Sequence, residues 1–131
     1  MSTLPNSKSV PKGVDVEKIK KMVARRNLAG LANDTKWDEL IESIRSKKEW
    51  RPSYRSKSVS GYISGWDTEW HYHLPFPLVG VEWFDISLQA TSSEPSTEWI
   101  IKLVSEIGFE YEVNKDKLRI WGYGPKSYDE F

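Results

Sequence analysis

The stretch WDTEWHYHLP, from Trp66 to Pro75, brings together side chains that could do chemistry. Within ten residues it holds two acids, two histidines and three large aromatic residues. Three roles are consistent with these residue types: a catalytic or metal-binding strand, a surface that recognises a partner, or an ordinary strand with a polar outer face. The spacing of the residues is the first test among these roles.

Successive side chains of an extended strand point to opposite faces. If the whole stretch is a strand, one face is apolar and mostly aromatic, and the other carries every ionisable group. The first set is Trp66, Trp70, Tyr72 and Leu74, and the second is Asp67, Glu69, His71 and His73. This alternation is typical of a half-buried strand. It predicts that the aromatic set lies in the core and the ionisable set faces solvent.

The pair His71 and His73 raises the possibility of a metal-dependent enzyme, because imidazole is a good ligand for zinc, copper or iron. A closed site needs three or four converging ligands, and these are the only two histidines in the chain. Glu82 or Asp85 from a neighbouring strand would have to complete the site. The pattern is too incomplete to favour a metal, so we expect no metal and no cofactor.

No catalytic motif accompanies these residues. The sequence contains no nucleophile elbow, no phosphate-binding loop and no HExxH pattern. It also contains no cysteine, which excludes a disulfide framework, a thiolate zinc site and a cysteine nucleophile. We therefore expect that the protein is not an enzyme.

A recognition surface explains the ionisable set with fewer assumptions than a metal does. Acids and histidines around exposed aromatic residues can bind a basic partner. Carboxylates can also mimic the phosphates of a nuclease's substrate. The predicted partner-binding residues, taken as the polar outer face of the central strands, are Asp67, Glu69, His71, His73, Glu82 and Asp85.

A nucleic-acid-binding surface is the alternative. Residues 1–57 carry a net charge of +7 (14 Lys and Arg, 7 Asp and Glu), and residues 58–131 carry −7 (5 and 12). The basic segment Lys47–Lys57 interleaves cations with Trp50 and Tyr54, which could stack on bases. The whole chain is neutral, however, and the two halves cancel if they pack together. We therefore expect a protein partner rather than a nucleic acid.

The periodicity of the chain predicts an α+β fold. Apolar residues recur at helical spacing after Gly13, in 31–50 and in 91–108, whereas alternating or apolar runs at 54–66, 69–76 and 78–90 predict strands. Residues 109–113 and 117–123 form a predicted hairpin. The predicted order is ααβββαββ, with three helices on a mostly antiparallel sheet of about five strands.

The length of 131 residues fits one domain. We expect a flexible N-terminal tail over 1–13, a single domain over 14–123 and a C-terminal tail over 124–131. No apolar run is long enough to cross a bilayer, and the N-terminus lacks the apolar region of a signal peptide. We therefore expect a cytoplasmic protein without membrane contact.

Four segments resemble a family of small bacterial proteins of unknown function. They are NDTKWDELIESI (33–44), RPSYRSKSVSG (51–61), WDTEW (66–70) and VEWFDI (81–86), and the resemblance covers about residues 16–123. Its motifs are an N-x-x-x-W-x-x-L helix and an E-W-x-D-I strand. Such proteins are similar to immunity proteins encoded beside polymorphic or contact-dependent toxins. The resemblance implies a module that covers the active site of a cognate toxin, and it supplies no catalytic residues.

Overall fold

A computed structural model describes residues 4–131, and the fold is α+β as predicted. Four antiparallel strands form the main sheet in the order β2-β3-β5-β4, and two short strands, β1 and β6, form a second antiparallel pair. The strands are β1 (Ala29–Gly30), β2 (Tyr54–Ser58), β3 (Val81–Ser87), β4 (Tyr111–Asn114), β5 (Lys117–Trp121) and β6 (Tyr123–Gly124). The helices are α1 (Val16–Arg25), α2 (Asp34–Arg45) and α3 (Glu98–Ile107), with a 3-10 turn, η1 (Leu78–Gly80).

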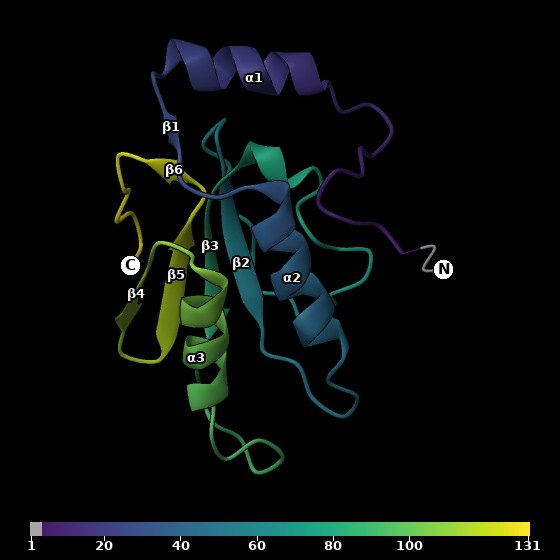
Figure 1. Ribbon diagram of the computed structural model, residues 1–131, viewed down its shortest axis with the longest axis vertical. Coiled ribbons are helices and arrows are strands. Elements are labelled where there is room, and N and C mark those ends of the chain that lie inside the picture. The colour runs from purple at the N-terminus through teal and green to yellow at the C-terminus, as the bar shows by residue number, and fades with distance from the viewer. Residues whose placement is uncertain (1–3) are drawn as a thin grey trace.

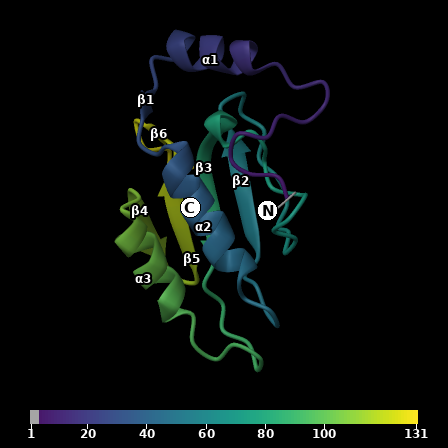
Figure 2. The same ribbon diagram turned by 45° about the vertical axis from the view of Figure 1, so that its right-hand side comes forward.

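Helices α2 and α3 cover one face of the main sheet (Figures 1 and 2). Helix α2 starts where the Asn33 side chain accepts the backbone N–H of Lys36, and it buries the apolar stripe that the sequence predicts. Helix α3 ends at Gly108, whose φ of 95° is a left-handed conformation that favours glycine. The core between helices and sheet includes Trp37, Leu40, Ile44, Phe84, Ile86, Ile100, Leu118 and Ile120.

Helix α1 crosses one end of the sheet and stands apart from the other two helices (Figure 1). None of its residues is fully buried. It contacts η1, and the side chain of Ile19 reaches Gly80 there. This arrangement leaves the apolar side of α1 only partly covered.

The prediction of a strand at residues 69–76 is wrong, because the structure has a series of bends in this segment. It belongs to a long loop between β2 and η1. The first part of the loop, residues 62–67, turns back at Gly61 and runs beside β2, to which it is joined by isolated bridges. The predicted second strand, 69–76, is therefore part of this loop, and the segment beside the free edge of β2 is residues 62–67, which the prediction places in the first strand.

The second face of the main sheet carries a row of alternating charge. In cross-strand register, Arg55 of β2 pairs with Asp85 of β3, Asp85 with Arg119 of β5, and Arg119 with Glu112 of β4. The Asp85 carboxylate accepts two hydrogen bonds from Arg119, at 2.6 and 2.8 Å, and one from Arg55 at 3.0 Å. Asp85 and Arg119 are both fully buried, and the Arg119 guanidinium stacks 3.5 Å from the ring centroid of Trp83.

Glu82 and Asp85 are both buried, so the prediction that they lie on a solvent-facing row is wrong. Glu82 lies where the pairing of β2 and β3 is irregular, and its carboxylate binds Arg26 at 2.6 Å and Lys57 at 4.0 Å. The buried acids of the second half of the chain thus neutralise cations of the first half. These ion pairs join Arg26, Arg55 and Lys57 of the basic half to Glu82 and Asp85 of the acidic half.

The two predicted tails pack on the domain in the part that the structure describes; residues 1–3 of the N-terminal tail lie outside it. The Ser7 backbone N–H donates to Asp38 at 2.8 Å, and Ser7 is fully buried against α2. At the other end, the Ser127 carbonyl accepts the Trp121 indole N–H, and the Glu130 carbonyl accepts Arg55 at 2.7 Å. The last residues thus cover part of the charged row.

Within residues 4–131, every helix is too short or too polar to span a bilayer.

We predict that Asp85→Asn lowers the free energy of unfolding by about 3–5 kcal/mol, because it leaves the buried Arg119 guanidinium without a compensating charge. Urea denaturation followed by circular dichroism measures the change. Glu106→Gln is the matched control, since this exposed acid of α3 makes only a 3.9 Å pair with Lys102 and should change stability by less than about 0.5 kcal/mol. Equal effects of the two substitutions would contradict a structural role for the charged row.

Candidate partner-binding surface

The loop that replaces the predicted second strand is anchored in the core by Trp70. This side chain is fully buried, and its indole N–H donates to the Pro52 carbonyl at 2.8 Å. Its ring meets Tyr54 of β2 edge-on, with 4.9 Å between ring centroids, and the Tyr54 hydroxyl donates to the Glu69 carbonyl at 2.6 Å. Leu74 is the second buried anchor. Of the predicted core set, Trp70 and Leu74 are therefore confirmed.

The Glu69 carboxylate folds back onto the loop instead of facing solvent freely. One of its oxygens accepts the backbone N–H groups of His71 at 2.5 Å and Tyr72 at 2.7 Å, with His73 more distant at 3.4 Å. Partial burial raises the pKa of Glu69, but these hydrogen bonds to the charged form outweigh it, so the pKa lies below its ordinary value. Glu69 is thus a cap for the bend at 71–73.

Arg45 of α2 holds the same bend from the helix side. Its guanidinium donates to the carbonyls of Trp70 at 2.7 Å and His71 at 2.9 Å. The N–H groups of residues 71–73 and the carbonyls of Trp70 and His71 therefore have partners within the protein. Hydrogen bonds to these backbone groups hold the loop in one conformation, so ordering it on binding costs little conformational entropy.

Asp67 and His73 form the one pair of predicted site residues whose side chains bind each other. One Asp67 oxygen accepts the Glu69 backbone N–H at 2.9 Å, and the other lies 2.9 Å from Nδ1 of His73. The hydrogen bond from the Glu69 backbone lowers the pKa of Asp67; desolvation opposes this, and the contact with His73 adds to it. Both side chains remain substantially exposed, at 40% and 61%.

The same loop exposes three large aromatic side chains. Tyr62 is 70% exposed, Trp66 45% and Tyr72 63%. The prediction that Trp66 and Tyr72 lie in the core is wrong, because the alternation of a strand does not apply across the bends. One contact holds Trp66 in place: the Arg55 guanidinium lies 5.0 Å from its ring centroid. We call residues 61–73 the aromatic loop.

One hollow borders the aromatic loop, and a second lies next to the first. The polar hollow, of about 420 Å³, lies between the edge of β2 and the loop, and it includes Tyr62, Ser64, Trp66, Asp67 and His73. The apolar hollow, of about 300 Å³, lies between α1 and the start of β3 and includes Ile19, Met22, Val59, Phe76 and Pro77. Ser58 and Pro75 line both, so the two hollows form one continuous surface.

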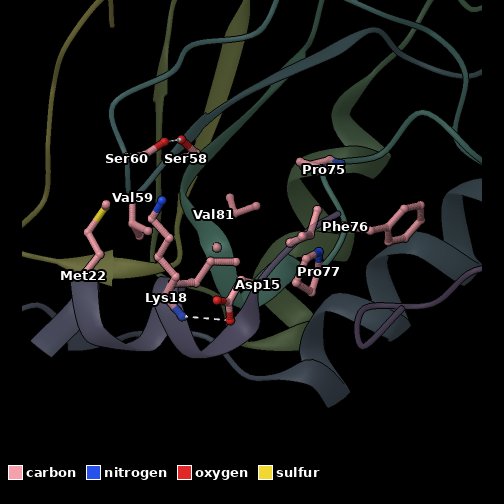
Figure 3. A pocket seen from close by; sticks show the side chains of 13 residues that line it. Asp15, Lys18, Met22, Ser58, Val59, Ser60, Pro75, Phe76, Pro77 and Val81 are labelled. Carbon is pink, nitrogen blue, oxygen red and sulfur yellow. Dashed lines mark hydrogen bonds between the residues drawn. The ribbon is translucent and has the colours of Figure 1, made fainter. Parts of the chain in front are cut away.

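Figure 3 shows the apolar hollow from close by, with the side chain of Lys18 extending from α1 toward Val59. The dashed contact at Asp15 is the Lys18 backbone N–H donating to the Asp15 side chain, which caps α1. Apolar side chains from α1, from β3 and from the 75–77 segment face this space. The hollow exists because α1 covers the end of the sheet incompletely.

The structure does not assemble the predicted metal alternative. No three His, Asp or Glu side chains among residues 4–131 are grouped as metal ligands. His73 is paired with Asp67, whereas Glu82 and Asp85, considered as completing ligands, lie in ion pairs with Arg26, Lys57, Arg55 and Arg119.

The basic segment Lys47–Lys57 is used largely for internal contacts. Lys47 lies over the Trp99 ring, Arg51 donates to the Arg45 carbonyl, and Lys57 binds Asp129 at 2.8 Å. Tyr54 is buried in the core rather than available for stacking on a base. Lys47, Arg51 and Lys57 thus each have a partner within the protein.

Sequence reasoning missed Tyr62, the most exposed aromatic residue of the surface. It lies outside the decapeptide, and the alternation of residues 54–66 predicts that it is part of a longer strand. The signal that could have found it is Gly61, which has a φ of 100° and marks the turn that brings residue 62 back beside β2. A strand that ends at this glycine places Tyr62 in the loop.

We predict that the stability contributed by Glu69 depends on pH. Its pKa is lowered by folding, so the contribution is fully present above the unfolded value of about 4.3 and is lost as the pH falls through the lower folded value. Thermal unfolding between pH 7 and pH 3 should therefore show a smaller pH dependence in Glu69→Gln than in the unaltered protein. Glu106→Gln, with no such cap, should follow the unaltered protein; identical curves for all three would refute the role of Glu69.

Residues 19–127 match a family of unknown function, DUF6678. Neither the curated proteins nor the solved structures contain a match to the chain. The resemblance predicted from the sequence is confirmed as far as a family of unknown function; the quoted motifs and the likeness to immunity proteins stay predictions. Because the matched residues span more than half of the sequence, the chain belongs to the DUF6678 family.

Proposed function

We propose that the protein is a stoichiometric protein-binding module that uses the aromatic loop and the two hollows beside it. The observation that carries this proposal is the exposure of Tyr62, Trp66 and Tyr72 on one loop. Tyrosine and tryptophan are the residues most enriched among the dominant contacts of protein interfaces. Three exposed residues of these types on one loop of a small domain are not explained by packing in the core, and a binding role explains them.

The contacts that fix the conformation of the aromatic loop support the same proposal. Trp70 anchors it, Glu69 and Arg45 satisfy its backbone, and Arg55 supports Trp66. Binding by a surface that is already ordered loses less conformational entropy. An exposed loop with no function would not need so many internal contacts to fix its shape.

The proposed roles of the predicted partner-binding residues now differ from one another. Asp67 and His73 line the polar hollow and are proposed to contact the partner. Glu69 positions the loop, and His71 lies within the bend that Glu69 caps. Glu82 and Asp85 act in the sheet, where they hold β2, β3 and β5 together.

We propose, more specifically, that the partner is the cognate toxin domain of a bacterial contact-dependent system and that the protein acts as its immunity protein. The resemblance described above suggests this class, and blocking an active site requires only a complementary surface. A nuclease is the preferred toxin, since its cationic substrate site would complement Asp67. The same proposal places the protein in the cytoplasm, without enzymatic activity of its own.

Co-purification with the product of the adjacent reading frame tests this function. We predict a 1:1 complex in which the toxin's activity is lost. Tyr72→Ala should weaken the complex about 30-fold, as expected for a dominant interface residue worth about 2 kcal/mol. Val113→Ala is the control, because this exposed apolar residue lies on β4, away from the aromatic loop.

Absence of any complex, together with an adjacent product that lacks toxic activity, would refute the immunity function. If Tyr72→Ala, Trp66→Ala and Tyr62→Ala each leave the affinity of the complex unchanged, the aromatic loop is not its interface.

A further inference from the structure

We propose that the polar hollow binds the guanidinium group of an arginine side chain from the protein partner. This inference rests on the proposed binding function and names the chemistry of the contact. The hollow combines the three components that recognise such a cation: an exposed carboxylate, exposed aromatic rings and oxygen acceptors.

The Asp67 carboxylate gives the polar hollow its negative charge. Asp67 is its only carboxylate, and no Lys or Arg lines it. The two cations of β2 are engaged elsewhere. Arg55, whose guanidinium lies 5.0 Å from the Trp66 ring centroid, binds Asp85 at 3.0 Å, and Lys57 binds Asp129 at 2.8 Å and Glu82 at 4.0 Å. A cation entering the hollow therefore meets no lining lysine or arginine and finds an acceptor already in place.

The Asp67 carboxylate has capacity for a further donor. An ionised carboxylate offers about four lone-pair sites. Two contacts are present, from the Glu69 backbone N–H and from His73, both at 2.9 Å. These contacts fix the orientation of the carboxylate at the rim of the hollow. The same hydrogen bonds keep the pKa of Asp67 below its ordinary range, so the group stays charged.

The aromatic part of the hollow suits a planar cation. Trp66 and Tyr62 both line it, and both rings are substantially exposed. The Arg55 guanidinium already lies 5.0 Å from the ring centroid of Trp66, so the ring that remains available to a ligand is that of Tyr62, which is 70% exposed. Guanidinium groups stack on aromatic faces and bind carboxylates through paired N–H donors, which a compact ammonium cannot do equally well. Arginine is therefore preferred over lysine.

Hydroxyl groups complete the set of acceptors. Ser56, Ser58 and Ser64 line the hollow beside the carboxylate. The Ser64 hydroxyl already accepts the Ser56 backbone N–H at 2.9 Å, which holds it toward β2. A guanidinium has five N–H donors, more than one carboxylate can satisfy, so neighbouring oxygen atoms are needed for the remainder.

Nuclear magnetic resonance titration of the full chain tests the proposal without a known partner. The probes are N-acetyl-arginine amide and its neutral isostere N-acetyl-citrulline amide. We expect the arginine probe to shift the Trp66 indole N–H and the backbone resonances of 62–67 and 73 in a saturable way. We expect the citrulline probe to cause at least tenfold weaker binding, because it has the same shape without the charge.

Three variants sharpen this experiment. Asp67→Asn keeps an oxygen that can accept the Glu69 backbone N–H and should weaken the arginine probe about tenfold. Tyr62→Leu should weaken it several-fold by removing the available ring face. Glu106→Gln, an exposed acid of α3, should leave it unchanged, and circular dichroism checks that all three variants are folded.

The proposal is overturned if neither probe shifts these resonances, if both bind equally, or if the shifts spread over all exposed acids and resist Asp67→Asn. Its failure is separable from failure of the protein-binding function. Capture of a partner that is insensitive to Asp67→Asn would retain the binding function and reject the hollow. Specific binding of the arginine probe by a protein that captures no partner would retain the guanidinium site and reject the protein-binding function.

Discussion

The Asp85 carboxylate, fixed between the buried guanidinium groups of Arg55 and Arg119, is the contact on which the rest of the structure depends. It joins three neighbouring strands at one level of the sheet, and Glu112 continues the alternation of charge on the fourth. A slip of one residue in any strand would turn an ion toward the apolar helices, where it would lose both its partner and its solvent. Register, the choice of the helix-covered face and the position of the last residues all follow from this row.

The same row supports the candidate surface. The Arg55 guanidinium binds Asp85 and also contacts the ring of Trp66. The next residue toward the N-terminus, Tyr54, points to the opposite face and anchors the aromatic loop through Trp70 and the Glu69 carbonyl. Two adjacent residues of β2 therefore tie the loop to the charged layer and to the apolar core. The shape of the surface depends on the stability of the sheet beneath it.

The local part of this architecture could be predicted from the sequence. The stripe from Trp37 to Ile44 defines α2, Gly108 ends α3, and the hairpin over Tyr111–Trp121 turns at residues 115 and 116, as its polar residues indicate. Each of these features depends on residues a few positions apart, so periodicity and turn chemistry suffice to find it.

The candidate site was harder to predict because it depends on distant partners. Asp85 finds Arg119 34 residues away, and no local pattern distinguishes this buried acid from an exposed one. In the decapeptide, Glu69 and Asp67 alternate with aromatics as in a strand, but their carboxylates accept nearby backbone N–H groups and stabilise bends. Short acidic side chains compete with strand pairing in this way, and period-2 spacing does not reveal which outcome wins.

The irregular pairing of residues 62–67 with β2 has a consequence for the behaviour of the protein in concentrated solution. On the outer edge of β2, the Tyr54 N–H and carbonyl are bonded to Asp67, the Ser56 N–H and carbonyl to Ser64, and the Ser58 N–H to the Tyr62 carbonyl. An exposed strand edge with free backbone groups is a template for adding strands from other molecules. The loop that presents the aromatic residues thus also occupies the backbone groups of β2 that would otherwise accept an added strand, and β4 forms the opposite edge of the sheet.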